Sequence, residues 1–505
     1  MLNSFFQSIF TEDDGLLSPL PNKMPSIEDT NISVTSAGVL KLLNDIDVSK
    51  SCGPDNITGT NLKTFSHLVA DILAEICNYS LASCSLPDIW KEARVVAIYK
   101  KGSRHLPNNY RPVSLTCILC KLLEHIIARH VHGFLDMNDI LVESQHGFKG
   151  GRSCDTQLVY TVNDLAYNHE TGTITDVIIL DFSKAFDTVS HRKLLHKHSS
   201  IGININLIKW IEGFLKNRGQ VVKVDNSESS RCWVSSGVPQ GSVLGPLLFL
   251  IFINDLTDQI TSECRLFADD ALLYNTRSNS QVLQEDLNQL ETWSRDWQLF
   301  FNIDKCSVLS VKDPKLDQKY YLNNQRLRNV NSHPYLGVVL SYDLKWAEHL
   351  KKIIAKSYKL LGMLYRVLRS ADTRTRQLAY YTLIRPILEY GCPVWDPYLK
   401  KEIKQLETIQ NRAVRFIFRI RGQTSFTKIK ANANIPLLKD RRKNLRINLY
   451  CKSLSSGVIA DTHNSPPEKH HNTRQRGGLY IPAIKTKAFF NSFWPRTTRD
   501  IRDGI

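Results

Sequence analysis

The segment RLFADDALLY, residues 265 to 274, is the feature that most restricts how this chain can fold. It places two adjacent carboxylates, Asp269 and Asp270, between two apolar stretches, a pattern that predicts a strand, a turn and a second strand with both carboxylates at the turn. Two explanations are open. The turn is an acidic surface hairpin, since Asp favours turns, or it holds a divalent cation, since hard cations prefer carboxylate oxygens.

Composition restricts the class of protein. A chain of 505 residues that is 42% apolar and 23% charged is typical of a globular protein with two to four domains, or of one large multi-lobed enzyme. Its longest apolar run, VLGPLLFLIFI, is too short to span a bilayer and contains a proline, and the N-terminus does not read as a secretory signal. We therefore expect no membrane partner and an intracellular location, in the nucleus or the cytoplasm, with no targeting signal identified.

The cysteines and histidines do not form a metal-ligand pattern. The 11 cysteines are scattered, and the one close pair, Cys117 and Cys120, lies in a helix-like apolar stretch, which favours core thiols over a zinc site. Irregular cysteine spacing suits a reducing compartment. Near Cys451, three histidines are irregularly spaced and are interpreted as solvated: His463, His470 and His471.

Positive charge is concentrated at the C-terminal end. The whole chain carries a net charge of +16, and residues 401 to 505 hold 22 Lys and Arg against 7 Asp and Glu, a local net of +15. This asymmetry favours a polyanion partner such as nucleic acid, and the alternative is a solvated basic tail. On a helix over 409–422, one cationic stripe would form from Arg412, Arg415 and Arg419, with Arg421 near its edge. The opposite side would anchor that helix through Ile409, Val414, Ile417 and Phe418.

Local patterns predict the remaining elements. Residues 1–90 are expected to be mostly helical, 93–103 to form a strand, and the chain to be helical again to about 138. After residue 340 the period is helical, with a kink at Pro386, and the tail after about 455 is expected to pack poorly.

A second carboxylate-bearing strand suggests chemistry. TDVIILDFS, residues 175 to 183, has the pattern of a buried strand that delivers Asp181 to its rim. If this strand neighbours the 265–274 hairpin, three carboxylates converge, and divalent ions about 3.5–4 Å apart would compensate them and clamp a phosphoryl displacement. Cationic donors for a triphosphate are available from Lys100, Lys101 and Arg111. The Gly-rich loop at 237–245 would let backbone approach a nucleotide closely.

Eight motifs in this order resemble those of the reverse transcriptases of non-LTR (LINE-type) retrotransposons, most closely the jockey-like branch. The resemblance runs from about residue 4 to about 500. The motifs are GPDNITGTNLK, NYRPVSL, QHGFKGGRSCDTQL, LDFSKAFDTVSH, GVPQGSVLGPLLF, LFADDALLY, NIDKCSVLSV and YLGVVLS. The resemblance implies an α+β right-hand polymerase with fingers, palm and thumb and a mainly antiparallel palm sheet. It also implies an RNA template, a DNA primer, dNTPs and two Mg²⁺ ions, with Mn²⁺ as an alternative metal.

The resemblance carries roles onto individual positions. The family's metal-binding carboxylates match Asp181, Asp269 and Asp270. Fingers residues that meet the triphosphate match Lys100 and Arg111, and the loop beside the nascent base pair matches Gln240 and Gly241. A lysine that protonates pyrophosphate matches Lys305, and the primer grip matches YLGV at 335–338. Structural alternatives stay open: a solvated turn lysine at 100 or 305, a salt-bridge arginine at 111, and ordinary turn glycines at 237, 241 and 245.

Phe186 bears on the choice between DNA and RNA as product. The resemblance places its ring under the sugar of the incoming nucleotide, where an apolar ring would collide with a ribose 2′-OH and offer it no hydrogen bond. Asp187, one residue later, is expected to point elsewhere if the backbone there is extended. The chain is therefore predicted to use deoxynucleotides.

The sequence thus predicts a magnesium-dependent RNA-directed DNA polymerase in five parts. These are a helical extension (1–92), fingers (93–175), palm (176–340), a helical thumb (341–425) and a basic, partly disordered region (426–505). We expect a copy that lacks an endonuclease domain and ends early. Group II intron reverse transcriptases and viral RNA polymerases match the motifs less well. A catalytically inactive nucleic-acid-binding relic is the remaining alternative.

Overall fold

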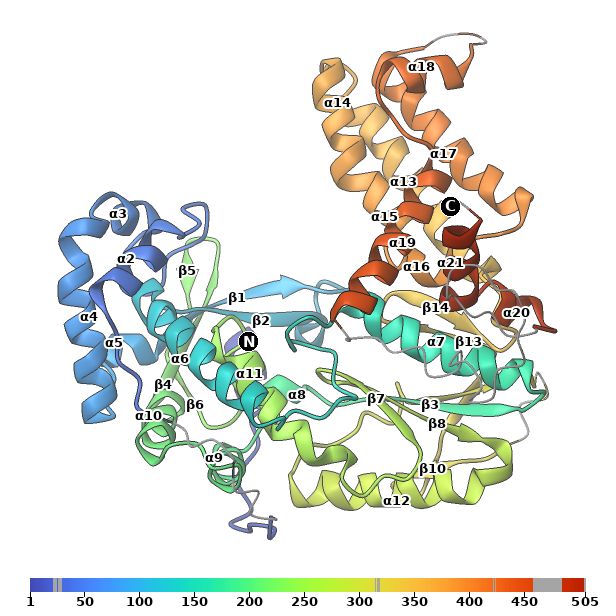
Figure 1. Ribbon diagram of the computed structural model, residues 1–505. Coiled ribbons are helices and arrows are strands. Elements are labelled where there is room, and N and C mark those ends of the chain that lie inside the picture. Colours follow the sequence, from blue (N-terminus) through green and yellow to red (C-terminus); the bar gives the residue numbers. More distant parts are fainter. Residues whose placement is uncertain are drawn as a thin grey trace. The chain divides into compact units, whose positions relative to one another are not determined.

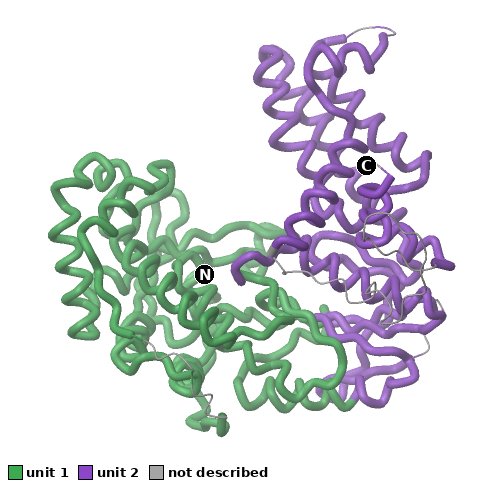
Figure 2. The backbone as a smooth tube through the Cα atoms, in the orientation of Figure 1, with its two compact units in different colours: residues 1–148, 180–271, 285–305 green, residues 149–179, 272–284, 306–505 purple. Residues whose placement is uncertain are grey.

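The structure, a computed structural model, describes residues 1–20, 25, 30–313, 315, 318–420, 422, 424–456 and 484–503. His463, His470, His471 and Arg421 lie outside the described residues. The chain forms two compact units, each assembled from separate segments (Figure 2). Unit 1 comprises residues 1–148, 180–271 and 285–305, and unit 2 comprises residues 149–179, 272–284 and 306–505. The expected five-part division stays a prediction.

Unit 1 contains the predicted N-terminal helices and a first sheet (Figure 1). Its helices are α1 (Leu2–Gln7), α2 (Ser36–Asn44), α3 (Gly59–Thr64), α4 (Ser66–Ser83), α5 (Asp88–Lys91), α6 (Ile118–Met137), α8 (Ala185–Thr188), α9 (His191–Ser200), α10 (Ile205–Leu215), α11 (Leu244–Ile253) and most of α12 (Ser280–Asp296). Its strands are β1 (Glu92–Tyr99), β2 (Tyr110–Leu115), β4 (Arg218–Val224), β5 (Ser227–Glu228), β6 (Cys232–Val234) and β7 (Glu263–Phe267).

Unit 2 carries the C-terminal helices and the remaining strands. Its strands are β9 (Ser307–Val311), β10 (Tyr321–Leu322), β11 (Gln325–Arg326), β12 (Arg328–Val330), β13 (Ser332–Tyr335), β14 (Val338–Ser341) and most of β3 (Thr175–Asp181) and β8 (Asp270–Thr276). Its helices are α7 (Cys154–Glu170), α13 (Ala347–Val367), α14 (Thr373–Ala379), α15 (Arg385–Glu389), α16 (Cys392–Trp395), α17 (Lys400–Phe418), α18 (Phe426–Asn432), α19 (Leu438–Ser456), α20 (Lys487–Phe490) and α21 (Phe493–Arg502).

Two five-stranded sheets organise the strands. In the first, β1 pairs with β2 antiparallel and with β4 parallel. In the second, the strand order is β12-β9-β3-β8-β7, with β3 antiparallel to β9 and β12 parallel to β9. The α+β class is therefore confirmed, and the second sheet mixes both strand directions. This order makes β3 and β8 neighbours, which the carboxylate hypothesis required.

Local patterns explain the central elements. Every residue of β3 except its last, Asp181, is buried, as expected for a strand covered on both faces. Helix α11 is apolar throughout and buried at nearly every position, and no helix among the described residues is long and apolar enough to cross a membrane. Cys117 and Cys120 are fully buried free thiols, and burial raises the pKa of Cys117 to about 12. They are core residues, as predicted.

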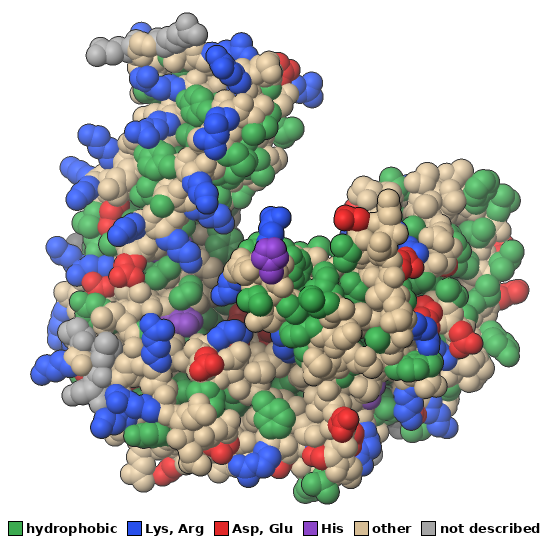
Figure 3. All heavy atoms as spheres, turned by 180° about the vertical axis from the view of Figure 1, so that it is seen from behind, with side chains coloured by type: hydrophobic (Ala, Val, Ile, Leu, Met, Phe, Trp, Pro, Cys, Tyr) green, Lys and Arg blue, Asp and Glu red, His purple; other side chains and the backbone are tan. Residues whose placement is uncertain are grey.

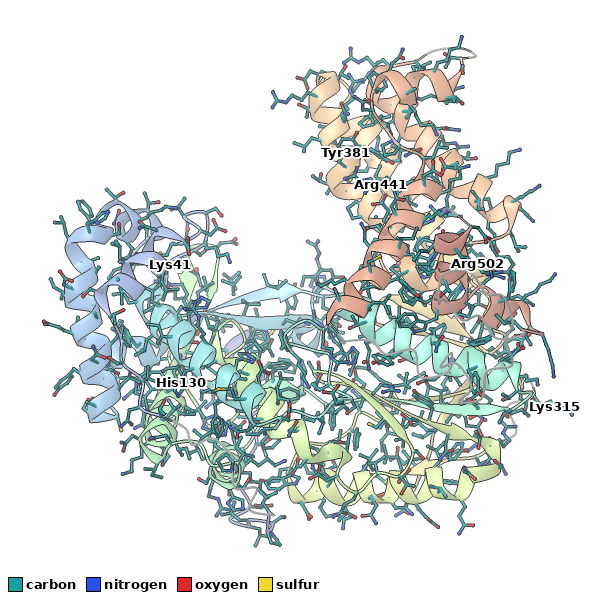
Figure 4. The ribbon with its side chains drawn as sticks, in the orientation of Figure 1. Lys41, His130, Lys315, Tyr381, Arg441 and Arg502 are labelled. Atoms are coloured by element: carbon teal, nitrogen blue, oxygen red, sulfur yellow. The ribbon has the colours of Figure 1, made fainter. Side chains whose placement is uncertain are left out.

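In unit 2 the helices surround a core that includes Trp395, Leu406 and Trp494. The helical pattern is interrupted next to Pro386: a π-helical turn, Tyr380–Ile384, precedes α15, where the proline lacks an N–H to continue the α-helical pattern. The kink itself stays a prediction. Arg441, labelled on α19 in Figure 4, donates to Glu389 of α15 over 2.9 Å.

Candidate active site

Asp181 and the Asp269–Asp270 pair end up at adjacent strand ends. Asp181 is the last residue of β3, and its carbonyl accepts a hydrogen bond from the N–H of Asn302 over 2.7 Å. Asp269 lies in the turn between β7 and β8, and Asp270 is the first residue of β8. The predicted strand–turn–strand is therefore confirmed, and all three carboxylates belong to unit 1.

The acidic turn is clamped by a segment to which the sequence analysis gave no role. Ala268 has a positive φ of 54°, which is unfavourable for a residue with a Cβ. The buried Gln145 accepts hydrogen bonds at Oε1 from the N–H groups of Ala268 and Gly147, over 2.9 and 2.8 Å. A Cβ on Gly147 would lie 2.4 Å from the nitrogen of Ala268. The QHGF motif therefore fixes the strained turn that presents Asp269 and Asp270. The signal in the sequence was the motif itself.

Cationic side chains accompany the carboxylates. The ammonium of Lys305 lies 2.5 Å from Oδ2 of Asp181. Lys100 follows β1, and its N–H donates to the carbonyl of Asn109 over 2.8 Å, next to the strand that carries Arg111. Burial and the neighbouring charges of Arg111 and Lys305 lower the pKa of Lys100. The structure therefore brings Lys100, Arg111 and Lys305 within electrostatic reach of the acidic turn.

The carboxylates affect one another. Burial, followed by the charge of Asp181, raises the pKa of Asp269. Desolvation, followed by the charges of Asp269 and Asp181, raises the pKa of Asp270 to about 6, although the Asp270 side chain itself remains exposed. Both shifts are opposed by the cationic Lys100. The three acidic groups therefore share one electrostatic environment.

Among the residues that the structure describes, no three His, Cys, Asp or Glu side chains are grouped so that they could hold a metal ion as they stand. The carboxylate pair and Asp181 interact at longer range, and Lys305 contacts Asp181. The structure therefore brings three carboxylates to adjacent strand ends, and the metal site itself stays a prediction.

The predicted nucleotide loop is fixed by backbone contacts on two sides. Gly237 has a φ of 85°, and a Cβ there would lie 2.7 Å from the carbonyl oxygens of Phe186 and Asp187. Gly241 has a φ of 119°, and a Cβ there would lie 2.5 Å from the carbonyl oxygen of Ser114. These glycines therefore permit a close approach of backbone to backbone, beyond the ordinary turn role.

The helix that follows this loop has a buried cap. Glu124, fully buried on α6, accepts hydrogen bonds at Oε2 from the N–H groups of Val243 and Leu244, over 2.6 and 3.1 Å. A carboxylate at the first turn of α11 satisfies backbone donors that would otherwise be unpaired. Glu124 therefore anchors the loop from behind. No motif pointed to it, because its partner lies 119 positions away.

Phe186 lies on the short helix α8, half-buried, with its ring stacked on that of Phe249 at a centroid distance of 4.6 Å. The extended backbone assumed for this segment is therefore wrong. The left-handed conformation of Lys184, with a φ of 53°, starts a helical turn in its place. As a result Asp187 accepts a hydrogen bond from the Gln240 side chain over 2.8 Å.

The segment matched to the primer grip is a tight hairpin in unit 2. Tyr335 ends β13, Leu336 and Gly337 form the turn with positive φ, and β14 begins at Val338. The hydroxyl of Tyr390 donates to the carbonyl of Leu336 over 2.9 Å.

The predicted arginine stripe is only partly helical. Helix α17 ends at Phe418, so the expected helix over 409–422 is too long, and Arg419 adopts a left-handed conformation as its C-cap. Its guanidinium donates to the carbonyl of Arg369 over 3.0 Å. Arg412 lies over the ring of Tyr358 and Arg415 over that of Phe426. Ile409, Val414 and Ile417 are fully buried, as predicted, and Phe418 is half-buried.

A second basic row, not predicted, lies on α13. It repeats along one face of the helix and its members are exposed: Lys352, Lys356, Lys359 and Arg366. With 1.5 Å per residue, the row is about 21 Å long. The only acidic residue of α13 is Glu348, in its first turn. Figure 3 shows Lys and Arg side chains gathered over the C-terminal helices of unit 2.

Comparison with known proteins identifies a family and several relatives. Residues 98–362 match the family Reverse transcriptase (RNA-dependent DNA polymerase). The chain is 29% identical to the probable RNA-directed DNA polymerase from transposon BS of Drosophila melanogaster, over 81% of this chain and 47% of that protein. It is 26% identical to the RNA-directed DNA polymerase from mobile element jockey of the same organism, over 84% of this chain and 49% of that protein.

The chain thus spans about half the length of these relatives. Among solved structures, a telomerase from Candida tropicalis, in complex with the TWJ fragment of telomeric RNA, is similar with a TM-score of 0.41 and 10% identity. That similarity covers 81% of this chain and 67% of the telomerase chain. Because the matched region is more than half of the sequence and contains the acidic turn, Asp181 and their cationic neighbours, this chain belongs to the reverse transcriptase family.

Proposed function

We propose that this chain is an RNA-directed DNA polymerase of a non-LTR retrotransposon, which copies an RNA template into DNA from a DNA primer. The observation that carries the proposal is the position of Asp181 and of the Asp269–Asp270 pair at the ends of the adjacent strands β3 and β8, inside the region that matches the family. The relatives are themselves RNA-directed DNA polymerases from transposons. Because the substrates are nucleic acids, we place the enzyme inside the cell, in the nucleus or the cytoplasm.

The chemistry of the acidic donors fits a divalent cation. Carboxylate oxygens are hard ligands that suit Mg²⁺, and Mn²⁺ accepts the same donors. We propose that Asp181 and Asp269 hold the metal, with Asp270 as the weaker third ligand. When bound, two such ions would stabilise the charge that develops on the transferred phosphoryl group. Lys305 occupies Oδ2 of Asp181, so its ammonium and a metal ion would compete for the same oxygen.

The cationic residues then have distinct tasks. Lys100 and Arg111 are proposed to bind the triphosphate, where their positive charges offset the phosphate charge and hold the nucleotide in place. Lys305 is proposed to give a proton to the departing pyrophosphate oxygen, a task for which an ammonium group within hydrogen-bond reach is suited. Gln240 and Gly241 are proposed to line the nucleotide through the loop that contacts β2.

Phe186 is proposed to select the sugar. Its ring rests on Phe249, a buried residue of α11, at an interplanar angle of 21°. A ring supported on one face by a rigid helix cannot easily withdraw from a 2′-OH, and it offers that hydroxyl no partner. The support from Phe249 therefore favours rejection of ribonucleotides.

A basic surface of unit 2 is proposed to bind the primer–template duplex. It comprises the predicted residues Arg412, Arg415 and Arg419 together with the exposed row of α13. Rows of Lys and Arg bind phosphates without reading bases, so the affinity should be tolerant of sequence and should fall steeply with salt.

A templated primer-extension assay tests the function. Purified protein, an RNA template, an annealed DNA primer, four dNTPs and Mg²⁺ are expected to give full-length DNA. Asp181→Asn and Asp269→Asn are expected to abolish extension while melting temperatures stay close to that of the parent, since Asn preserves the side-chain volume. Primer–template binding without extension by the parent would identify the inactive relic instead.

A further inference from the structure

Asp187 and Gln240 are joined by a hydrogen bond that links two parts of the proposed nucleotide site. The side-chain nitrogen of Gln240 donates to Oδ1 of Asp187 over 2.8 Å. The backbones are joined as well, because the N–H of Val238 donates to the carbonyl of Phe186 over 2.7 Å. On the other side, the N–H of Ser114 donates to the carbonyl of Gln240 over 2.7 Å. The backbone at Gln240 is therefore fixed, and its side chain has one anchored end.

The chemistry of this pair determines which way the amide faces. An ionised carboxylate can only accept hydrogen bonds, whereas an amide carries a donor group and an acceptor group. Asp187 therefore selects the nitrogen of Gln240 and turns Oε1 away from itself. Burial raises the pKa of Asp187 to about 6, while Lys184 and the Gln240 bond oppose the shift. At neutral pH the carboxylate is thus ionised, and one amide orientation is favoured.

The first residues of the chain hold Asp187 in place. The N–H of Thr11 donates to the hydroxyl of Ser236 over 2.8 Å, and that hydroxyl donates to the carbonyl of Asp187 over 2.8 Å. Further along, the hydroxyl of Ser190 donates to Asp13, and the buried ammonium of Lys193 donates to Asp14 over 3.0 Å. The segment 11–14 is therefore linked to Asp187 and to the residues that follow its turn.

We propose that Asp187 is a positioning residue that fixes the amide of Gln240 so that its carbonyl oxygen serves as the hydrogen-bond acceptor toward the incoming nucleotide. This inference rests on the proposed function, because it takes Gln240 to be a nucleotide contact. Asp187 itself touches no substrate. Without Asp187, the Gln240 side chain could turn either its NH₂ group or its carbonyl oxygen toward the nucleotide. Asp187 removes the first of these two orientations.

The test compares two substitutions that keep the number and branching of the side-chain heavy atoms. Asp187→Leu removes both oxygens and is expected to raise the KM for dNTP about tenfold, the value of a hydrogen bond to a charged group. Asp187→Asn keeps an acceptor but also offers a donor to the reversed amide. Equal populations of the two orientations would raise the KM only about twofold. For both variants kcat is expected to change by less than about threefold, since the reacting groups are untouched.

A double-mutant cycle separates positioning from a merely structural role. In a Gln240→Ala background, Asp187→Leu is expected to leave the KM unchanged, because the group it positions is gone. If the two KM increases multiply instead, Asp187 does not act through Gln240 and the inference is wrong. An unchanged KM for Asp187→Leu alone, or for Gln240→Ala alone, would also overturn it.

Asp286 provides the matched control in unit 1. It is a buried carboxylate that accepts hydrogen bonds from the N–H groups of Thr261 and Ser262, over 2.9 and 2.8 Å. Asp286→Asn is expected to lower the melting temperature without altering the KM. Binding of dTTP to a complex with a dideoxy-terminated primer is measured in parallel. If the parent neither extends a primer nor binds dTTP, the proposed function fails and this inference fails with it. Failure of the cycle in an active enzyme overturns the inference alone.

Discussion

The ammonium group of Lys305 lies 2.5 Å from Oδ2 of Asp181. The residue proposed as the proton donor thus contacts a proposed metal ligand. Removing it should therefore slow the reaction but strengthen metal binding. Lys305→Ala is expected to lower kcat by about 100-fold, as for the loss of a general acid. The Mg²⁺ concentration at half-maximal activity should fall, because the competing ammonium is gone. Primer extension over a MgCl₂ titration measures both quantities.

Lys41→Ala is the control for this experiment, because it removes an exposed ammonium on α2 of unit 1 that has no proposed role in the site. It should leave kcat and the Mg²⁺ requirement near the parent values. A Lys305→Ala enzyme that needs more Mg²⁺ than the parent would show that Lys305 assists metal binding. Excess chelator should stop extension by every active variant.

Phe186→Ala is expected to admit ribonucleotides, because the ring that blocks the 2′-OH is removed. The ratio of kcat/KM for dNTP to that for rNTP should fall. Phe249→Leu is the informative companion, since it leaves Phe186 in place but removes the ring stacked on it at 4.6 Å. It should reduce the ratio partially. If neither variant changes the ratio, Phe186 is a packing residue and selection of the sugar lies elsewhere.

Gly147→Ala is expected to lower kcat by about 100-fold, because a small displacement of the turn at Ala268 would move the carboxylates of Asp269 and Asp270 out of position. A new Cβ would lie 2.4 Å from the nitrogen of Ala268, a contact with backbone that no rotamer relieves. Gly150→Ala lies in the same motif with nothing within 4 Å, so it should retain parental activity. Equal activity of the two variants would mean that the QHGF segment does not position the acidic turn.

The two basic rows of unit 2 are expected to contribute unequally to duplex binding. Replacing Lys352, Lys356 and Lys359 by Gln should lower the salt slope of primer–template affinity by about 0.7–0.9 for each phosphate that is no longer neutralised. The corresponding Arg412, Arg415 and Arg419 triple should lower it less, because these side chains already contact Tyr358, Phe426 and the carbonyl of Arg369. Fluorescence anisotropy at several salt concentrations measures the slopes. A larger effect of the arginine triple would show that the main duplex-binding surface is the stripe predicted from the sequence.

Lys197 predicts a pH dependence of stability. It is buried among Phe252, Trp293 and Trp297 and lies 2.5 Å from Asp255. Burial lowers its pKa to about 8 from 10.5, only partly offset by Asp255. The unfolded chain therefore binds this proton more tightly, so the group disfavours folding below pH 8, and the penalty fades as pH rises from 8 to 10.5.

The free energy of unfolding of the parent, minus that of Lys197→Met, should therefore increase over this interval. Chemical denaturation at about pH 7 and about pH 10 measures the difference, and subtraction of the variant removes the effect of other titrating groups. A difference that stays constant or decreases would show that the Lys197 ammonium is stabilised, not penalised, by its surroundings.

Much of the site was predictable because its signals are local. The apolar run before Asp181 and the two apolar stretches around Asp269 and Asp270 specify strands by their period, and the carboxylates mark the ends. Because the motifs also occur in family order, fold class and function could be predicted without coordinates. The local backbone was less predictable. Two local features depend on residues in the left-handed conformation: Lys184 precedes the helix at Phe186, and Arg419 ends α17. A hydrophobic pattern does not specify such a conformation.

The sequence by itself determined which residues carry the charge and in which elements they lie. Only the tertiary structure decided how those residues are held, because the contacts join positions far apart in the chain. Gln145 bonds Ala268, which lies 123 positions later in the sequence, and Glu124 bonds Val243, 119 positions later. Asp187 and Gln240 are separated by 53 positions. Hydrogen bonds of this kind depend on side-chain geometry within about 3 Å. The period of two or 3.6 residues in a sequence does not tell which distant residues will form such bonds. The residues that position the site could therefore be identified only in the folded structure.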